Sequence, residues 1–175
     1  MNDWTAIRAH YRLYGKEILS GPKNEWAIDP YLWDNGMLRM TPIESALWAD
    51  IRDAGAILYP QYPVLGFFVD FANPVAKIAI ECDGAAYHLD REKDAARDDL
   101  LNSAGWRVYR ISGRDCFTEY DRGTHEHGYA RRLIQEICDR HGISRESQSR
   151  GGWISASELS AAQARRVLDI AGDSA

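Results

Sequence analysis

The stretches Gly66-Phe-Phe-Val-Asp70-Phe-Ala72 and Lys77-Ile-Ala-Ile-Glu81-Cys-Asp83 each place acids within a short apolar run. Such runs, bounded by turn residues, predict β-strands, and strand side chains alternate between two faces. Glu81 and Asp83 are therefore expected side by side on one face. Asp70 is expected opposite Phe67, Val69 and Phe71. If the strands pair as an antiparallel hairpin, Asp70 lies near Glu81 and three acids converge at one end of the sheet.

The residues around this hairpin predict an α/β core. Thr41-Pro-Ile-Glu44 combines a hydroxyl N-cap, proline at the first helical position and glutamate three residues after the cap. Short loops favour antiparallel neighbours, and a helix between two strands favours a parallel crossover. We expect a mixed sheet flanked by helices, in the order helix 42–54, strands 57–62, 66–72 and 77–83, helix 90–104, strand 106–112.

Further helices are expected outside this core. Trp4, Ile7, Tyr11, Tyr14 and Ile18 fall on one helical face after Asp3, and Gly21-Pro22 ends that helix. An apolar face over 124–141 predicts another covering helix. The expected division is an N-terminal helical extension 1–40, a core 41–141, a linker 142–152 and a C-terminal amphipathic helix 153–175.

Composition narrows the class of protein. The 175 residues are 45% hydrophobic, which fits one well-buried domain. Three cysteines without a C-x-x-C pair argue against a disulfide framework and a cysteine zinc site. There is no apolar window of about 20 residues and no signal-peptide pattern, so we expect a cytoplasmic protein without a membrane partner.

Charge is concentrated in the predicted core. The net charge is −5, and residues 42–99 hold 11 acids against 5 bases, a local balance of −6 that leaves +1 elsewhere. Acids gathered in a partly buried site repel one another, and a hard divalent cation offsets that repulsion. The alternative is a set of solvated carboxylates, with Asp83-Gly84 an ordinary turn.

An ordered series of short motifs spans residues 41–112. It comprises Thr41-Pro-Ile-Glu44-x-x-Leu-Trp48, Gln61-Tyr-Pro, Val69-Asp70-Phe71, Ile80-Glu81-Cys-Asp83-Gly84, His88, Asp94-x-x-Arg97-Asp98-x-x-Leu101, Gly105-Trp106 and Arg110. In order and context, this series resembles the PD-(D/E)XK nuclease superfamily in its very-short-patch-repair-like branch.

The resemblance implies a metal site. Asp70, Glu81 and the main-chain carbonyl of Cys82 would be the protein ligands of Mg²⁺ or Mn²⁺. Glu44 would approach the site through a metal-bound water, although its capping role explains it equally well.

Other motif residues have weaker assignments. Gln61 matches a position near the scissile phosphate, or is a surface residue. His88 would donate a proton to the leaving oxygen or hold a phosphate, or is structural. Asp83 stands where the superfamily has lysine, which leaves the general base unassigned.

Four arginines are candidates for nucleic-acid contact: Arg97, Arg107, Arg110 and Arg114. The alternative is that Arg97 and Arg110 pair with Asp94, Asp98 or the site carboxylates inside the fold.

The expected activity is a Mg²⁺- or Mn²⁺-dependent DNA endonuclease, in which a metal-activated water attacks phosphorus with inversion and, by resemblance, leaves a 5′-phosphate and a 3′-hydroxyl. The residues do not separate DNA from RNA or fix the oligomeric state; a homodimer would let two sites cut both strands. One alternative is a catalytically inactive nuclease-fold module that binds nucleic acid or a protein partner, favoured by the missing lysine and the acidic net charge. Another is an oligomerising protein with solvated acids.

Overall fold

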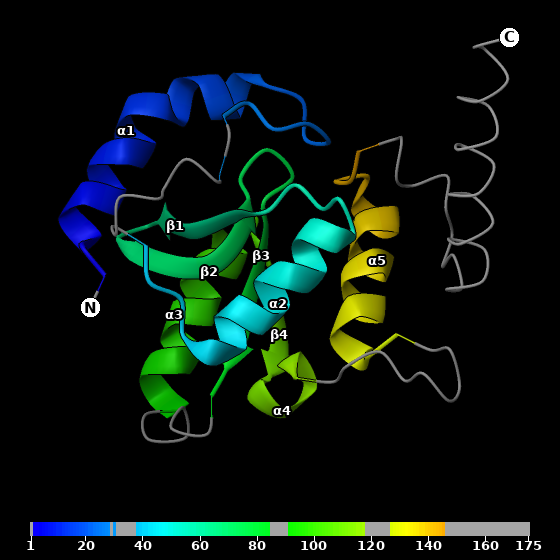
Figure 1. The fold of residues 1–175 in the computed structure, drawn as a ribbon. Coiled ribbons are helices and arrows are strands. Elements are labelled where there is room, and N and C mark those ends of the chain that lie inside the picture. The colour runs from blue at the N-terminus through cyan, green and yellow to red at the C-terminus, as the bar shows by residue number, and fades with distance from the viewer. Residues whose placement is uncertain (1, 29, 31–37, 85–90, 118–126, 146–175) are drawn as a thin grey trace, which may run out of the picture.

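A four-stranded sheet with helices on both faces forms the centre of the molecule (Figure 1). The computed structural model describes residues 2–28, 30, 38–84, 91–117 and 127–145. The elements are α1 Trp4–Ser20, α2 Pro42–Asp53, β1 Tyr59–Val64, β2 Phe67–Asn73, β3 Ile78–Asp83, α3 Arg91–Ser103, β4 Arg107–Ser112, α4 Gly113–Cys116 and α5 Tyr129–His141. The expected α/β class is confirmed, with the core order helix, three strands, helix, strand.

The sheet is mixed, as the loop lengths predicted. Its order is β1-β2-β3-β4, with antiparallel β1–β2 and β2–β3 pairs and a parallel β3–β4 pair. Leu65 and Gly66 make the β1–β2 turn with φ of 49° and 87°, the left-handed conformation that tight two-residue hairpins require. The predicted start of β1 was two residues early, because the Ile57 amide donates to the Ile143 carbonyl at 2.8 Å rather than to β2.

The predicted capping box starts α2. Thr41 Oγ1 accepts from the Glu44 amide at 3.4 Å, and Glu44 Oε2 accepts from the Thr41 amide at 2.7 Å. Pro42 occupies the first helical position, where its missing amide hydrogen is not needed. The cap fixes where α2 begins, and therefore where Glu44 lies relative to the sheet.

Each face of the sheet has its own apolar core. On one face, α2 and α5 bury Leu47, Ile51 and Ile134 against Phe71 and Ile80. On the other, residues of α1 and α3 pack against β1 and β2: Ile7, Tyr11, Ile18, Tyr59, Tyr62 and Leu101. The sheet is therefore the middle layer of three, and α1 contributes to one of the two cores.

Some details differ from the sequence prediction or fall outside the described residues. The four-residue helix α4 was not predicted, and α5 begins at Tyr129, after a non-helical Gly128. Cys82, Cys116 and Cys138 are free and buried, as their odd number indicated. The expected helix 153–175 and residues 146–152 of the linker lie outside the described residues. Across the described part of the chain, no helix has the length and apolar character needed to span a membrane.

Candidate active site

Strands β2 and β3 separate at Asp70. Their pairing runs through Asn73↔Ile78, Ala72↔Ala79 and Phe71↔Ile80 and stops there. One step further, the same register would set Asp70 opposite Glu81. Instead, the Asp70 side chain takes the place of a strand partner: its Oδ2 accepts from the Cys82 amide at 2.7 Å. A carboxylate is thus held between two central strands.

The neighbouring pair β1–β2 is also irregular at this level. The register passes from Pro60↔Phe71 to Tyr62↔Val69, without a regular pair at Gln61. Gln61 has a positive φ of 47°, uncommon for a residue with a side chain, and its Nε2 lies 3.5 Å from Asp70 Oδ1. Backbone strain of this kind is frequent where a side chain must be held for function.

This irregularity overturns one expectation about faces. Alternation predicted Phe67, Val69 and Phe71 on a common face. Phe71 packs in the α2–α5 core, but Val69 packs in the core on the α1 side. The alternation breaks because the backbone leaves regular strand geometry at the level of Asp70, where a side chain replaces a ladder hydrogen bond.

Glu81 lies one residue beyond the last β2–β3 pair and is only 3% exposed. Its Oε1 accepts from Arg97 Nη2 at 2.5 Å, and the same nitrogen donates to the Phe68 carbonyl at 2.8 Å. Arg97 comes from α3, one helical turn before the buried Leu101. Arg97 therefore ties α3 to both strands that carry the acids.

Asp83 and Glu81 point away from the Ile78–Ile80–Cys82 face, as predicted. Asp83 Oδ1 accepts from Arg110 Nη1 at 2.8 Å, and Arg110 Nη2 donates to Asp98 Oδ1 at 2.7 Å. The interpretation that Arg97 and Arg110 pair with acids inside the fold is confirmed by these contacts. Asp83 is therefore held in an ion-pair network with Arg110 and Asp98.

Burial shifts the two central carboxylates toward their protonated forms. Burial raises the pKa of Asp70 to about 6; the Glu44 charge adds to this, while hydrogen bonds from Cys82 and Gln61 and the Arg97 charge oppose it. Burial and then the Asp70 charge raise the pKa of Glu81 to about 8, despite Arg97 and Arg110. The two acids are close enough to repel each other, as expected if they share a site.

The remaining predicted residues fall at different places. Glu44 acts in the helix cap and is close enough to influence Asp70. Arg114 is exposed on α4, just after β4. Arg107 is exposed opposite Ile78, at the other end of β3 from Asp83. His88 lies outside the described residues.

Sequence reasoning named Asp98 as a possible partner of the two arginines but did not identify the Phe68 carbonyl as a member of this network. The Arg97–Leu101 spacing of four could have placed Arg97 against the sheet, since residues four apart share a helix face. Nothing in the sequence marked the Phe68 carbonyl, because it is a main-chain group at a position where two strands separate.

The site offers few oxygen ligands, but they are of the kind that a hard divalent cation prefers. Among the described residues, no group of three or more His, Cys, Asp or Glu side chains is arranged to hold a metal ion. Magnesium is commonly held by one or two carboxylates, with waters and substrate phosphate oxygens completing the shell. Asp70 and Glu81 supply two carboxylates, and the repulsion between them would be offset by a cation beside them.

Part of the chain matches a protein-family model and two uncharacterized proteins. The family model REase_MTES_1575 matches residues 43–127. An uncharacterized Haemophilus influenzae protein is 38% identical over 86 residues, covering 46% of this chain and 71% of that protein. The uncharacterized protein YcjD of Escherichia coli K12 is 36% identical over 61 residues, covering 34% of this chain and 52% of YcjD.

Among solved structures, the catalytic domain of the homing endonuclease I-Bth0305I is similar, with a TM-score of 0.44 and 22% sequence identity, over 58% of this chain and 98% of that one. The matched family segment begins in α2 and contains Asp70, Glu81 and Arg97. The chain belongs to the family of restriction-endonuclease-like proteins that the REase_MTES_1575 model describes.

Proposed function

We propose that this protein is a divalent-metal-dependent endonuclease that hydrolyses phosphodiester bonds of DNA. The observation that carries the proposal is the pair Asp70 and Glu81, buried side by side where β2 and β3 separate. Family membership supports nuclease chemistry, and the ordered motifs across 41–112 support the finer placement in the very-short-patch-repair-like branch.

Asp70, Glu81 and the Cys82 carbonyl are the residues that would hold Mg²⁺ or Mn²⁺. Bound there, the ion would supply a water that is nucleophilic at neutral pH and would offset negative charge on the phosphate. The chain's own contribution is preorganisation: the Cys82 amide and Gln61 orient Asp70, and Arg97 orients Glu81 through one oxygen, Oε1.

Two arginines also offset the negative charge of the Glu81 carboxylate. Arg97 and Arg110 both lower the pKa of Glu81, so they favour the ionised form that a metal requires. Arg110 is anchored by Asp83 and Asp98, which keeps its guanidinium beside the acids. In this arrangement Asp83 serves to position Arg110 and does not replace the missing lysine as a base.

Cleavage of supercoiled plasmid, a labelled DNA strand and a labelled RNA strand tests the proposal. Wild type is compared with Asp70→Asn and with Asp53→Asn, whose carboxylate is exposed and pairs with Arg131 outside the site. We expect cutting of DNA in Mg²⁺ or Mn²⁺, none in EDTA, and a loss of at least about 100-fold in Asp70→Asn but not in Asp53→Asn.

A second candidate is an inactive nuclease-fold module that binds nucleic acid. The observation in its favour is that Arg97 already contacts Glu81, in a site without the superfamily lysine. Binding of DNA by wild type with no cutting in either metal would establish that candidate.

A further inference from the structure

Helix α1 carries basic side chains that the nuclease site does not use. Arg8, Arg12 and Lys16 are spaced by four and follow one side of the helix, with no acid between Trp4 and Lys16. A hollow of about 330 Å³ lies along the first turns of α1. We call it the α1 basic groove; the described residues that line it are Trp4, Thr5, Arg8, Ala9 and Arg12.

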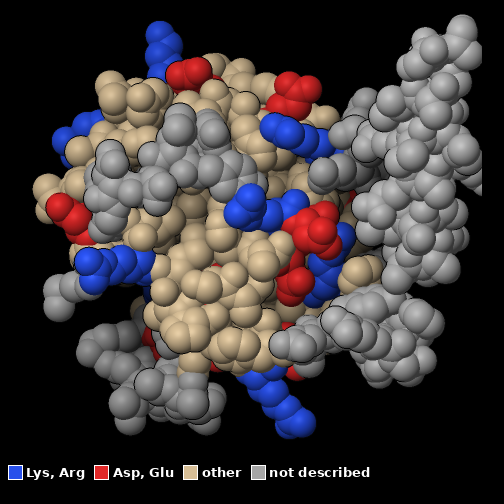
Figure 2. All heavy atoms as spheres, viewed as in Figure 1, with Lys and Arg blue, Asp and Glu red and all other residues tan. Residues whose placement is uncertain are grey.

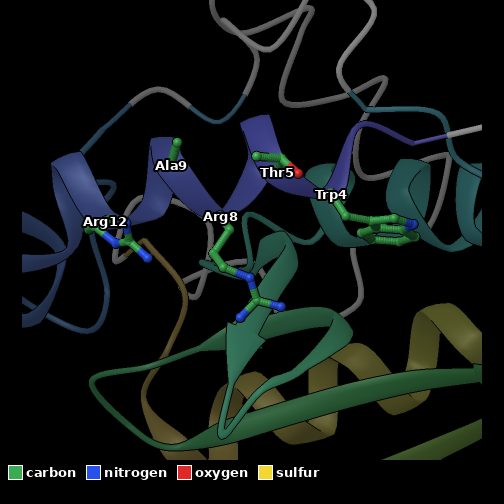
Figure 3. Close-up of a pocket in the computed structure, with 5 residues that line it drawn as sticks. All are labelled: Trp4, Thr5, Arg8, Ala9 and Arg12. Atoms are coloured by element: carbon green, nitrogen blue, oxygen red, sulfur yellow. The ribbon is translucent and has the colours of Figure 1, made fainter.

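The groove is partly preorganised by the β1–β2 hairpin. The Arg8 guanidinium carbon lies 4.6 Å from the centre of the Phe68 ring, and Arg8 Nη2 is 3.4 Å from the Gly66 carbonyl. Trp4 packs on the same ring at 4.7 Å and is still 42% exposed. Figure 3 shows Arg8 reaching from α1 toward the strands, with Trp4 and Arg12 to either side of it.

Arg12 differs from Arg8 in its contacts within the described part of the chain. It is exposed, and the described part of the chain supplies it with no hydrogen-bond or ion-pair partner. A solvated guanidinium next to a second one and an exposed indole provides charge and a flat apolar surface together. Phosphate contacts and stacking on aromatic rings are the two interactions by which proteins hold nucleic-acid strands irrespective of sequence.

Phe68 links the groove to the candidate active site. Phe68, which contacts both Trp4 and Arg8, offers its carbonyl to Arg97, and Arg97 contacts Glu81. Asp70 is two residues further along β2. Phe68 therefore contacts the groove residues through its ring and the arginine of the candidate site through its carbonyl.

The net charge of the chain does not by itself attract a polyanion. The chain has a net charge of −5, and on the face shown in Figure 2 basic and acidic side chains are interspersed. No large positive field covers that face, so a polyanion gains attraction from local groups of cations rather than from the molecule as a whole.

We propose that the α1 basic groove binds the sugar-phosphate backbone of the nucleic-acid substrate, beside the scissile phosphate. Arg8 and Arg12 contact phosphates, and Trp4 packs against a base or sugar. This inference rests on the proposed nuclease function and adds to it a second contact region on an element outside the matched family segment.

The test compares Arg8→Ala/Arg12→Ala with a matched double variant, Arg132→Ala/Arg140→Ala, which removes two exposed arginines of α5 on the other face of the sheet. Affinity for a fluorescent DNA duplex is measured by anisotropy in EDTA at several salt concentrations. We expect binding by the α1 variant to be about 10-fold weaker, with the slope of log K against log salt lower by about 2, and the α5 variant to behave as wild type.

Cleavage in Mg²⁺ provides a second readout. Loss of contacts made equally before and during the reaction raises KM and leaves kcat unchanged. Arg8→Lys/Arg12→Lys, which keeps the charge, is expected to restore most of the affinity. If Arg8→Ala lowers the melting temperature, Arg12→Ala alone answers the question, because the Arg12 side chain is exposed.

Failure of this inference is distinguishable from failure of the proposed function. If wild type binds and cuts DNA and both α1 variants do so with unchanged affinity and salt slope, the groove is not a nucleic-acid contact, whereas the nuclease proposal stands. If wild type neither binds nor cuts any nucleic acid, the proposed function fails, and this inference is overturned with it.

Discussion

At the scale of single residues, the central feature is a carboxylate that replaces a strand partner. The Asp70 carboxylate accepts a hydrogen bond from the Cys82 amide, which in a regular β2–β3 ladder would donate to a main-chain carbonyl. The exchange opens the sheet, brings Asp70 beside Glu81 and buries both. Two ionised acids in such surroundings lower the free energy of unfolding and favour a bound cation. The same geometry is therefore expected to destabilise the metal-free protein and to support the proposed metal-dependent hydrolysis.

The pKa of Asp70 gives the metal-free protein a defined pH dependence. The folded-state pKa of about 6 lies above the ordinary value of 3.8, so the fold binds this proton more tightly than the unfolded chain does. The resulting stabilisation is complete below about pH 4 and is lost as pH rises through 6. Asp70→Asn cannot ionise. In EDTA, its free energy of unfolding relative to that of wild type should therefore increase by about 1–3 kcal/mol as the pH rises from 4 to 8.

Urea unfolding at several pH values measures this difference. Asp53→Asn is the control, since it makes the same substitution at an exposed carboxylate that pairs with Arg131 away from Asp70. A difference between Asp70→Asn and wild type that does not vary with pH would contradict the burial and repulsion assigned to Asp70.

Arg97 is the residue on which Glu81 depends in the metal-free state. Replacing Arg97 with alanine leaves Glu81 and the Phe68 carbonyl without this donor, and should lower the free energy of unfolding by about 2–3 kcal/mol at pH 9. The loss should be smaller at pH 6, because Glu81 is then protonated in the fold. Chemical denaturation at the two pH values checks this; an equal loss at both would show that the Glu81 charge is not involved.

At the scale of elements, local signals placed most of the core. The Thr41–Glu44 capping box and the apolar alternation of β3 each depend on neighbours in sequence, and both were predicted correctly. The β1–β2 loop was expected at 63–65, but β1 continues to Val64 and the turn is Leu65–Gly66. The start of β1 was not predicted correctly, because the Ile57 amide donates to the carbonyl of Ile143, which is 86 residues further along the chain.

The candidate site divides in the same way. Asp70, Glu81 and Asp83 could be found from the sequence because carboxylates in apolar strands are unusual. The strand irregularity at Gln61, the break of alternation at Val69 and the bond from Arg97 to the Phe68 carbonyl could not. They arise where three elements meet, and no local pattern records how strands separate.

The contribution of the α2 cap to stability can be tested by substituting Thr41. Thr41→Ala removes the hydroxyl that accepts the Glu44 amide and should cost about 1 kcal/mol of stability. Thr41→Ser keeps the acceptor and should retain most of the stability. Thermal unfolding of the two variants tests the cap, and equal losses in both would show that the methyl group of Thr41, rather than its hydroxyl, is what α2 requires.

At the scale of the whole molecule, α1 forms part of the fold rather than an addition to it. It buries Ile7, Tyr11 and Ile18 over β1 and β2, while α2 and α5 cover the opposite face. The Tyr11 hydroxyl donates to the Pro60 carbonyl at 2.5 Å, next to the strained Gln61. The helix therefore supports the strand geometry beside the site, and in our proposal its other side contacts the substrate.

Two substitutions on α1 test this integration. Ile7 is fully buried and Leu13 is 73% exposed. Ile7→Ala should cost about 2–5 kcal/mol of stability, and Leu13→Ala less than about 0.5 kcal/mol. Urea unfolding of each decides the matter: similar small losses would mean that α1 is a separable extension of the core.

The most direct test of the central claim is the single-turnover rate of DNA cleavage in Mg²⁺ by wild type and Glu81→Gln, on a duplex that both proteins bind. Glutamine keeps an oxygen that can accept from Arg97 but cannot provide the negative charge a metal site needs. We predict Mg²⁺-dependent cutting by wild type and a loss of at least about 100-fold in the variant at similar DNA affinity. Cutting by Glu81→Gln at the wild-type rate, or wild-type cutting that is unaffected by EDTA, would contradict the account.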